Sequence, residues 1–511
     1  MTAIVSSIGL KGLSGYVVQV EVHISSGTES MVIVGLPYAS VKESKERVLS
    51  ALHSFDCDVT DEKIVVNLSP AEQKKNGPLF DLAMAVAVLK EKGQVKGVVD
   101  EGTAFIGALS LDGSVRTVNG LLPALISAKS LGFKRVFLPV DPLIPYEAFS
   151  DSIELVVVRH LQDVLNHLEG KPSLTPIPVE MVTSTAVVRE VERLDFRHII
   201  GHERAKRALV IAASGEHNVL MSGPPGCGKS ILAEVFSSIL PTLTKDKQLE
   251  VMSLYQLAGE SVSLPLSAPY RTPHHSASSV ALIGGGSNPK PGEVSLAHGG
   301  VLFLDEMAEF QKKTLDMLRQ PMESGRVTIS RVHSTVTYPA AFQLIGAMNP
   351  CPCGYLGSNV KYCSCTDKQV QSYRARVSGP VLDRVDILLH LVPVNLDREE
   401  EGALSSEELR VQVEGARARQ YERYGTEVSN AKVPFDVLSE YSPLTTSQRQ
   451  MVAQVSSKQQ WSNRVQIKII RLARTISDLR ESEVITDEAL WEAMSLRRLN
   501  QSSSQLSARE L

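Results

Sequence analysis

The feature that most constrains the fold is a glycine-rich segment, Gly223–Ser230, which matches the pattern Gly-x4-Gly-Lys-[Ser/Thr]. An apolar run, Asn218–Ser222, precedes it and predicts a strand, and Ile231–Leu240 predicts a helix after it. Glycines let successive backbone N–H groups turn toward a phosphate, and the helix N-terminus favours the same anion. The segment therefore predicts an α/β fold of the P-loop type that binds ATP and Mg²⁺. The predicted phosphate-binding residues are Gly223, Pro224, Pro225, Gly226, Cys227, Gly228, Lys229 and Ser230.

Within this loop, Lys229 is predicted to reach the β and γ phosphates and Ser230 to ligate Mg²⁺. A second apolar run, Val301–Leu304, ends in Asp305 and Glu306. Asp305 is predicted to hold Mg²⁺ through water, and Glu306 to polarise the attacking water. The alternative for this acid pair is a solvated helix N-terminus, where acids are favoured in any case.

Two more polar residues adjoin apolar runs. The run Gln343–Met348 ends at Asn349, whose amide can orient water, although asparagine before Pro350 is also a common turn residue. Arg384 precedes a later apolar run. A lone arginine usually forms a surface ion pair. In a ring of ATPases, however, it can reach into the neighbouring site as an arginine finger.

Four of the six cysteines fall close together, as Cys351, Cys353, Cys363 and Cys365. Four thiolates suit tetrahedral Zn²⁺ and leave no open coordination position, so this cluster predicts a structural zinc site. The alternative is four reduced thiols in a loop. An uneven distribution of cysteines is typical of a cytoplasmic protein rather than of a secreted disulfide scaffold.

Composition limits the class of protein. Hydrophobic residues make up 43% and charged residues 22%, which excludes disordered and fibrous chains. No apolar run is long enough to span a membrane, and the first residues do not resemble a signal peptide. At 511 residues about three domains are expected. Changes in composition predict an α/β domain over 1–170, a linker over 171–195, an ATPase core over 196–395, a helical domain over 396–500 and a flexible tail over 501–511.

Several stretches together resemble the ComM/YifB family of magnesium-chelatase-like AAA+ ATPases, and the resemblance covers nearly the whole chain. The most specific stretches are Pro273–Ser276, Leu282–Gly286, Pro291–His298, Gly300–Glu306, Leu318–Glu323, Asn349–Gly354 and Ser378–Arg384. The resemblance implies a hexameric ring ATPase associated with DNA branch migration, helicase activity, recombination and natural transformation.

The resemblance also implies roles for single residues. Lys229 and Ser230 correspond to Walker A, Asp305 and Glu306 to Walker B, and Asn349 to sensor 1. Arg384 corresponds to the arginine finger, with Arg376 as a rival. Arg464, predicted to stand ahead of the helix Ile469–Leu479, corresponds more loosely to the sensor 2 arginine of the lid.

The first domain resembles the proteolytic domain of Lon through Val65–Ala71, Asn76–Asp81 and Gly107–Arg116. Peptide hydrolysis of the Lon type needs a serine activated by a lysine. Leu79 occupies the serine position, and the segment expected to carry the lysine, Gly120–Leu125, contains none. We therefore expect a scaffold without peptidase activity.

The formal charge of −4 argues against a wholly basic nucleic-acid-binding protein, but residues 310–380 carry nine Lys or Arg and three acids, a local charge of +6. Rings of this type place hairpins in their pores. Arg326–Arg331 is predicted to form one arm of such a hairpin, and Lys290 to lie at the tip of the insertion Ala281–Lys290. Lys290, Arg326 and Arg331 are therefore the predicted DNA contacts, through phosphates and without reading sequence.

Two other functions compete with a DNA motor. The first is a chelatase motor subunit that acts on a tetrapyrrole complex, and the second is an AAA+ chaperone that remodels protein. The Lon-like domain and the cysteine loop argue against the chelatase, because both fit the ComM pattern. Stimulation of ATP turnover by DNA, or instead by unfolded protein, would distinguish the motor from the chaperone.

Overall fold

The computed structural model describes residues 2–37, 39–55, 57–75, 77–171, 194–260, 267–286, 289–331, 334–358, 361–394 and 403–497. Most of the predicted linker 171–195, the predicted boundary near 395 and the predicted tail 501–511 lie outside these residues. The chain divides into two compact units. Unit 1 comprises residues 1–188, 248–264 and 330–337, and unit 2 comprises residues 189–247, 265–329 and 338–511.

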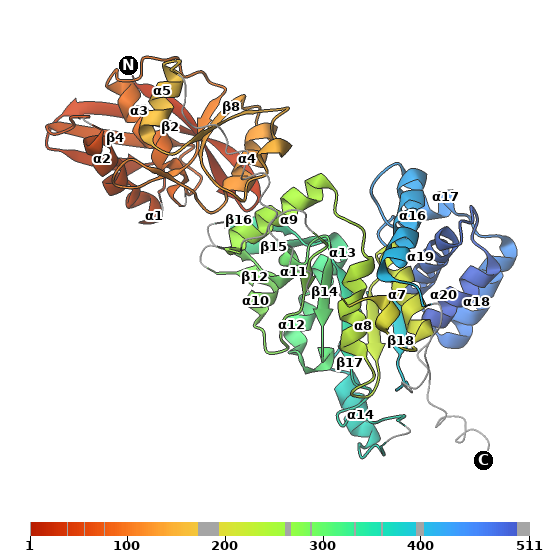
Figure 1. The fold of residues 1–511 in the computed structure, drawn as a ribbon. Helices are drawn as coiled ribbons and strands as arrows, with labels where there is room; N and C mark the ends of the chain where they lie inside the picture. The colour runs from red at the N-terminus through yellow and green to blue at the C-terminus, as the bar shows by residue number, and fades with distance from the viewer. Residues whose placement is uncertain are drawn as a thin grey trace, which may run out of the picture. The chain divides into compact units, whose positions relative to one another are not determined.

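Unit 1 is built on a seven-stranded mixed sheet (Figure 1). Its spatial order is β3 (Ser30–Val34), β4 (Glu62–Ser69), β2 (Ser14–Ser26), β1 (Ala3–Lys11), β5 (Thr103–Phe105), β8 (Arg135–Pro139) and β9 (Glu154–Val158). The pairs β1–β2 and β2–β4 are antiparallel, and the other neighbours are parallel. A small hairpin, β6 (Ala108–Leu109) with β7 (Val115–Arg116), stands apart from the sheet.

Helix α3 (Asp81–Glu91) forms the centre of unit 1, because every residue from Asp81 to Leu89 is buried against the sheet. Leu79, which occupies the serine position of the Lon resemblance, is 4% exposed and belongs to the same core. That position therefore offers no nucleophile. The other helices assigned mainly to unit 1 are α1 (Ala39–Lys42), α2 (Ser44–Ser54), α4 (Leu121–Ser130), α5 (Leu161–Leu168) and most of α9 (Lys245–Ala258).

Unit 2 contains a five-stranded parallel sheet. Its order is β11 (Tyr270–Arg271), β14 (Val301–Leu304), β17 (Gln343–Met348), β10 (Val219–Ser222) and β18 (Ile387–His390). Every residue of β14 and β17 is buried, as expected for parallel strands that are covered on both faces. The predicted strands Val301–Leu304 and Gln343–Met348 therefore coincide with β14 and β17, and the one predicted to start at Asn218 begins one residue later.

The helices of unit 2 that precede its C-terminal region are α7 (Glu203–Gly215), α8 (Lys229–Phe236), α10 (Ser279–Ile283), α11 (Glu293–Leu296), α12 (Lys312–Asp316), α13 (Arg319–Ser324), α14 (Asp367–Arg374) and α15 (Gly379–Leu382). The C-terminal helical region follows with α16 (Ser406–Tyr424), α17 (Phe435–Tyr441), α18 (Thr446–Gln459), α19 (Asn463–Leu479) and α20 (Asp487–Arg497). Helix α16 packs on α7 and α19, which joins this region to the sheet layer.

Helix α19 begins earlier than the sequence predicted. The Ser462 hydroxyl accepts a hydrogen bond from the Val465 N–H at 3.4 Å and so caps the first turn. Arg464, predicted to stand ahead of the helix, therefore lies within that first turn.

Two short hairpins adjoin each other. One pairs β12 (Gly284–Gly285) with β13 (Lys290–Pro291), and the other pairs β15 (Arg326–Arg331) with β16 (Ser334–Pro339). The Tyr338 hydroxyl of the second donates to the Pro289 carbonyl at 2.7 Å, just before β13. The prediction that Arg326–Arg331 forms one arm of a hairpin is confirmed.

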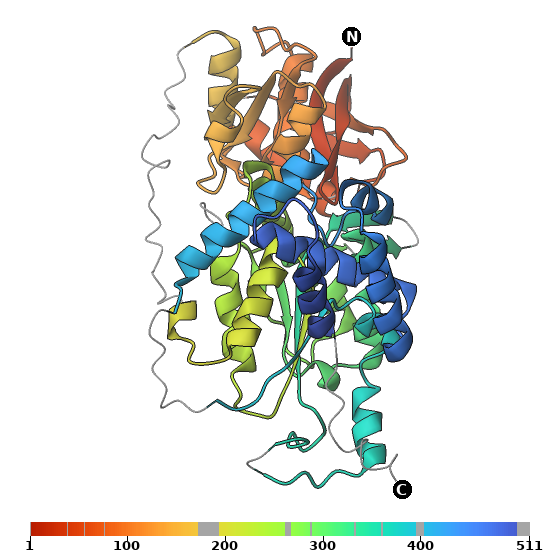
Figure 2. The same ribbon diagram turned by 90° about the vertical axis from the view of Figure 1, so that its right-hand side faces the viewer.

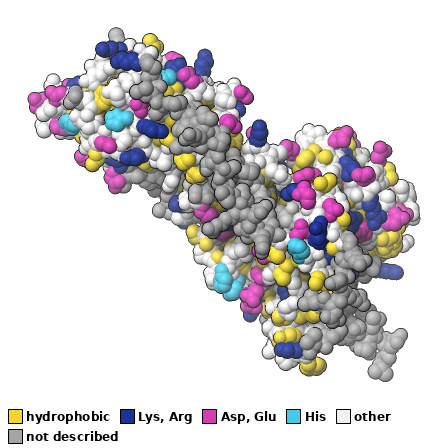
Figure 3. Space-filling model, in the orientation of Figure 1, with side chains coloured by type: hydrophobic (Ala, Val, Ile, Leu, Met, Phe, Trp, Pro, Cys, Tyr) yellow, Lys and Arg dark blue, Asp and Glu magenta, His cyan; other side chains and the backbone are white. Residues whose placement is uncertain are grey.

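The face of the molecule drawn in Figure 3 carries mixed charge. On the face in Figure 3, Lys and Arg side chains are interspersed with Asp and Glu side chains over both units, so neither sign dominates it. Figure 2, turned by 90° from Figure 1, shows the segment before α14 extending beyond one end of the five-stranded sheet. None of the helices in the described residues combines the length and apolar character needed to cross a bilayer.

Candidate nucleotide and metal sites

The glycine-rich loop Gly223–Ser230 connects β10 to α8. Gly226 and Gly228 have φ angles of 76° and 81°, in the left-handed region that residues with side chains rarely adopt, and this backbone turns the chain into α8. The Lys229 ammonium donates to the carbonyl oxygens of Gly223 at 2.8 Å and Pro224 at 2.9 Å. The loop and the first turn of α8 together form the kind of nest that binds phosphate.

Because β10, β17 and β14 are parallel neighbours, their carboxyl ends meet at one edge of the sheet. At that edge the Lys229 ammonium donates to the Asn349 side-chain oxygen at 3.3 Å, and the Ser230 hydroxyl donates to the Asp305 carboxylate at 2.9 Å. The structure thus brings together four of the predicted site residues. A hydroxyl and a carboxylate oxygen in direct contact are hard oxygen ligands, so Ser230 and Asp305 fit a shared Mg²⁺.

Glu306 follows Asp305 in a left-handed backbone conformation, with φ of 47°. Its carboxylate lies 3.3 Å from the Nδ1 atom of His275, and the ring of His275 lies against that of His274 with centroids 4.1 Å apart. This contact of His275 was missed from the sequence. His275 and Glu306 are distant in the chain, and neither the period of a helix nor that of a strand connects them.

Arg384 lies at the opposite edge of the sheet. It precedes β18, which runs parallel to β10, and its carbonyl accepts a hydrogen bond from the Asn218 side chain at 3.0 Å, just before β10. The four residues of β10 span roughly 13 Å, and this length separates the Arg384 carbonyl from the phosphate loop. The structure therefore does not bring Arg384 to the phosphate loop of its own chain.

The rival arginine occupies a different place. Arg376 donates to the Glu309 carboxylate at 2.7 Å, and Glu309 stands three residues after Glu306 at the carboxyl edge of the sheet. Arg376 is 51% exposed, whereas Arg384 is 16% exposed. Arg464 is exposed, and none of the hydrogen bonds found among the described residues joins it to the phosphate loop.

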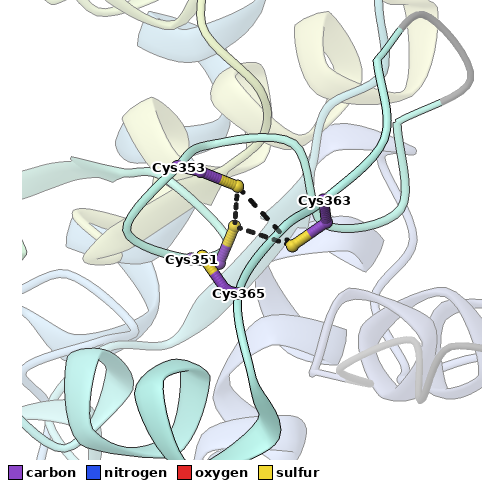
Figure 4. Close-up of side chains that lie close together, drawn as sticks. All are labelled: Cys351, Cys353, Cys363 and Cys365. Atoms are coloured by element: carbon purple, nitrogen blue, oxygen red, sulfur yellow. Dashed lines mark hydrogen bonds between the residues drawn. The ribbon is translucent and has the colours of Figure 1, made fainter.

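The four cysteines converge on one point from the two arms of a loop (Figure 4). Their sulfur atoms all lie within 4.8 Å of one another, and the distances from Cys351 to Cys353 and Cys363 are 3.4 Å and 3.7 Å. A tetrahedral site with metal–sulfur bonds of about 2.3 Å separates its sulfurs by about 3.8 Å. The thiols are thus arranged as zinc requires, and the first of them follows Asn349 by two residues.

The protonation of these thiols is uneven. The backbone N–H of Tyr355 lowers the pKa of Cys353 to about 6, so this thiol ionises near neutral pH. The pKa of Cys363 rises to about 12 although the Cys365 backbone acts to lower it, because burial and the neighbouring sulfurs favour its protonated form. Such a split is expected when several thiols share one site and titrate together.

The predicted nucleic-acid contacts lie on the two adjoining hairpins. Lys290 is exposed at the start of β13, and Arg326 is exposed at the start of β15. Along β15, Val327 and Ile329 are buried while Arg326 and Thr328 are exposed. Arg331 is exposed at the far end, but residues five apart on a strand point to opposite faces. Arg326 and Arg331 therefore point to opposite faces of β15.

Comparisons with known proteins agree on one family. Residues 195–399 match the family model described as "Magnesium chelatase, subunit ChlI", residues 20–141 match "Subunit ChlI of Mg-chelatase", and residues 403–497 match its C-terminal model. The chain is 37% identical over 510 residues to the uncharacterised protein YifB of Escherichia coli (strain K12), covering 98% of this chain and 97% of that protein.

Two further relatives extend the comparison. Identity to the competence protein ComM of Haemophilus influenzae is 37% over 504 residues, or 97% of each chain. Identity to the magnesium-chelatase 67 kDa subunit of Chlorobaculum parvum is 26% over 204 residues, which is 39% of this chain and 27% of that subunit.

Proposed function

This chain belongs to the ComM/YifB family of magnesium-chelatase-like AAA+ proteins, and from that premise we propose that it is an ATP-dependent DNA motor that works as a hexameric ring. The observation that carries the proposal is the division of the ATPase residues between two edges of one sheet. Lys229, Ser230, Asp305 and Asn349 meet at the carboxyl edge, and Arg384 lies at the amino edge. A complete site therefore needs a second copy of the chain.

The residues at the carboxyl edge have distinct tasks in ATP hydrolysis. The loop Gly223–Ser230 holds the phosphates, and Lys229 exchanges its carbonyl contacts for the β and γ phosphate oxygens. Ser230 and Asp305 hold Mg²⁺, which supplies positive charge to the phosphates when bound. Glu306 accepts a proton from the attacking water, and Asn349 orients that water.

The remaining charge on the transferred phosphate is stabilised from the next subunit, by Arg384 in trans. Arg464, in the first turn of α19, is assigned to the sensor 2 role in the helical region. Hydrolysis then moves the helical region, residues 396–500, against the core, residues 196–395, and this movement shifts the hairpins in the ring.

DNA binding is assigned to the hairpin pair β12–β13 and β15–β16. Lys290 and Arg326 are exposed on the two hairpins, and Arg331 lies at the far end of β15. Phosphate contacts of this type give affinity without sequence preference. Because one relative is named a competence protein, we place the motor in recombination or natural transformation, acting on single-stranded or branched DNA in the cytoplasm.

The assay that tests this function compares ATP turnover with branched DNA, with single-stranded DNA and with unfolded protein. We expect DNA to stimulate turnover and unfolded protein to have no effect. Replacing both Lys290 and Arg326 by alanine should weaken DNA binding. For a single strand, the salt slope should fall by about 0.7 for each phosphate that the variant no longer neutralises.

The matched control replaces Arg449 and Lys458, two exposed basic residues of α18, and should leave the salt slope unchanged. Stimulation by unfolded protein alone would contradict the DNA motor and support a protein-remodelling chaperone. Stimulation by neither would contradict both.

We also propose that Cys351, Cys353, Cys363 and Cys365 hold one structural Zn²⁺. Elemental analysis of freshly purified, reduced protein should give one zinc per chain, and replacing Cys363 by serine should remove it and expose residues 351–365 to proteolysis. Replacing Cys57, a buried thiol of unit 1, should leave the zinc content unchanged. A zinc content near zero in the unaltered protein would refute the assignment.

A further inference from the structure

We propose that Glu323 holds the arginine finger Arg384 within its own subunit and that DNA bound to the adjoining hairpin releases it. The inference rests on the proposed function and adds its regulation. Glu323 is in this view a positioning residue, since it acts on the neighbouring site only through Arg384. Four features of unit 2 lead to it: the ion pair, its incomplete hydrogen bonding, the place of Glu323 in the chain, and the anchoring of the Arg384 backbone.

The ion pair itself turns Arg384 toward its own chain. The Arg384 Nη2 atom lies 2.5 Å from the Glu323 carboxylate, and Nη1 donates to the Pro380 carbonyl at 2.6 Å. The arginine side chain is 16% exposed and the glutamate 56% exposed. A pair that is open to solvent on one side is weak, so a phosphate that accepts from the guanidinium can displace the carboxylate.

The guanidinium is also incompletely satisfied. Its Nε atom is buried and finds no hydrogen-bond partner among the described residues. Buried polar atoms are nearly always paired, and an unpaired one needs an explanation. A guanidinium that keeps one donor unused in this position gains hydrogen bonds when it moves to a phosphate, which accepts from two donors at once.

The place of Glu323 connects this pair to the hairpin. Glu323 is the second-to-last residue of α13, and β15 begins three residues later. Between them, the Ser324 hydroxyl donates to the Arg326 carbonyl at 3.1 Å, and the Ala340 N–H at the end of β16 donates to the Gly325 carbonyl at 2.8 Å. Both strands of the hairpin are thus tied to the end of α13, so a movement of the hairpin base moves Glu323.

The backbone of Arg384, in contrast, is firmly anchored. Asn218 donates to the Arg384 carbonyl at 3.0 Å, and Lys468 of α19 donates to the Val385 carbonyl at 3.1 Å and pairs with Asp386 at 2.8 Å. Burial alone would raise the pKa of Asp386, but Lys468 outweighs it and holds this pKa below its ordinary value. Only the Arg384 side chain is therefore free to change partner when Glu323 withdraws.

These contacts give a defined order of events. DNA engages Lys290 and Arg326, the base of the hairpin shifts, and Glu323 moves away from Arg384. The released guanidinium then reaches the phosphates in the neighbouring subunit. Turnover without DNA is low because the finger is held back, and turnover with DNA rises because the finger is available.

The test replaces Glu323 by glutamine, which keeps the size of the side chain and removes its charge. In the full-length protein with ATP and Mg²⁺, Glu323→Gln should raise turnover without DNA by about two- to fivefold, as expected for loss of a partly exposed ion pair. Turnover with saturating single-stranded DNA should stay the same, so the stimulation ratio falls by the same factor. Apparent ATP affinity should not change. An unchanged or lower rate without DNA would overturn the proposal.

The chain offers a matched control in the pair that Arg376 forms with Glu309. Glu309→Gln removes the partner of Arg376, at 2.7 Å, and should leave both rates as they are. If Glu309→Gln raises the rate without DNA and Glu323→Gln does not, the held finger is Arg376 and the proposal is wrong. The double variant Glu323→Gln with Arg384→Ala should show no gain, because the gain must pass through Arg384.

The same experiment separates this inference from the proposed function. If DNA fails to stimulate the unaltered protein but Glu323→Gln still raises turnover through Arg384, the DNA assignment is wrong and the restraint on the finger stands. If DNA stimulates normally and Glu323→Gln behaves as the unaltered protein, the DNA motor stands and the restraint is wrong. Melting temperature and assembly size confirm that each variant is folded.

Discussion

Replacing Arg384 by alanine is expected to lower ATP turnover by about 10³-fold or more while leaving nucleotide binding intact. The reason is its position at the amino edge of the sheet, separated from its own phosphate loop by the length of β10. From there Arg384 contributes nothing to ground-state binding in its own subunit. In the proposed ring its charge would act on the transition state in the next subunit, so we expect the turnover number to fall and the dissociation constant of ATP to stay the same.

Mixing two inactive variants tests the action in trans. Arg384→Ala retains a complete phosphate site, and Glu306→Gln retains a working finger. In randomly mixed rings about a quarter of the sites combine the two intact halves, so activity should return on mixing. Arg376→Ala, which changes the rival arginine, should retain turnover. Full activity of Arg384→Ala, or failure of the mixture to recover, would contradict the assignment.

Replacing Glu306 by glutamine is expected to lower turnover by about 10²- to 10⁴-fold, because the amide cannot accept the proton of the attacking water. ATP should still bind, since Lys229, Ser230 and Asp305 remain in place. Lys229→Ala should instead weaken ATP binding as well as turnover, because the lysine charge contacts the phosphates before and during the reaction. Steady-state kinetics with a separate binding titration distinguish the two patterns.

Glu309→Gln is the control for Glu306→Gln. It removes a carboxylate from the same turn, but that carboxylate pairs with Arg376 and not with a residue of the proposed ATP site. It should leave turnover near that of the unaltered protein. Normal turnover in Glu306→Gln would show that another group accepts the proton.

The site at the carboxyl edge of the five-stranded sheet could be predicted from the sequence because local patterns determine it. A glycine-rich loop between a strand and a helix fixes the order of elements, and apolar runs of four to six residues fix β14 and β17. Once the strands are parallel, the residues that follow them must meet at one edge. The positions of Asp305 and Asn349 could therefore be predicted without information about contacts between distant parts of the chain.

The contacts of Glu306 and Arg384 could not be predicted in this way. His275 lies against Glu306, and Glu323 against Arg384, across long separations in the chain that no period of helix or strand connects. They arise from how the helices and hairpins pack on the sheet. The opposite faces of Arg326 and Arg331 follow, in contrast, from the two-residue period of a strand alone.

The separation of Arg384 from the phosphate loop has a consequence for assemblies that do not close. Each subunit would give its finger to one neighbour and receive a finger from the other, which makes every contact head-to-tail. An open arc then has one terminal subunit whose ATP no finger reaches, and the other terminal subunit holds a finger with nothing to act on. In such an assembly a lone chain would have no complete site, so ATP would be hydrolysed at the full rate only once the ring has closed.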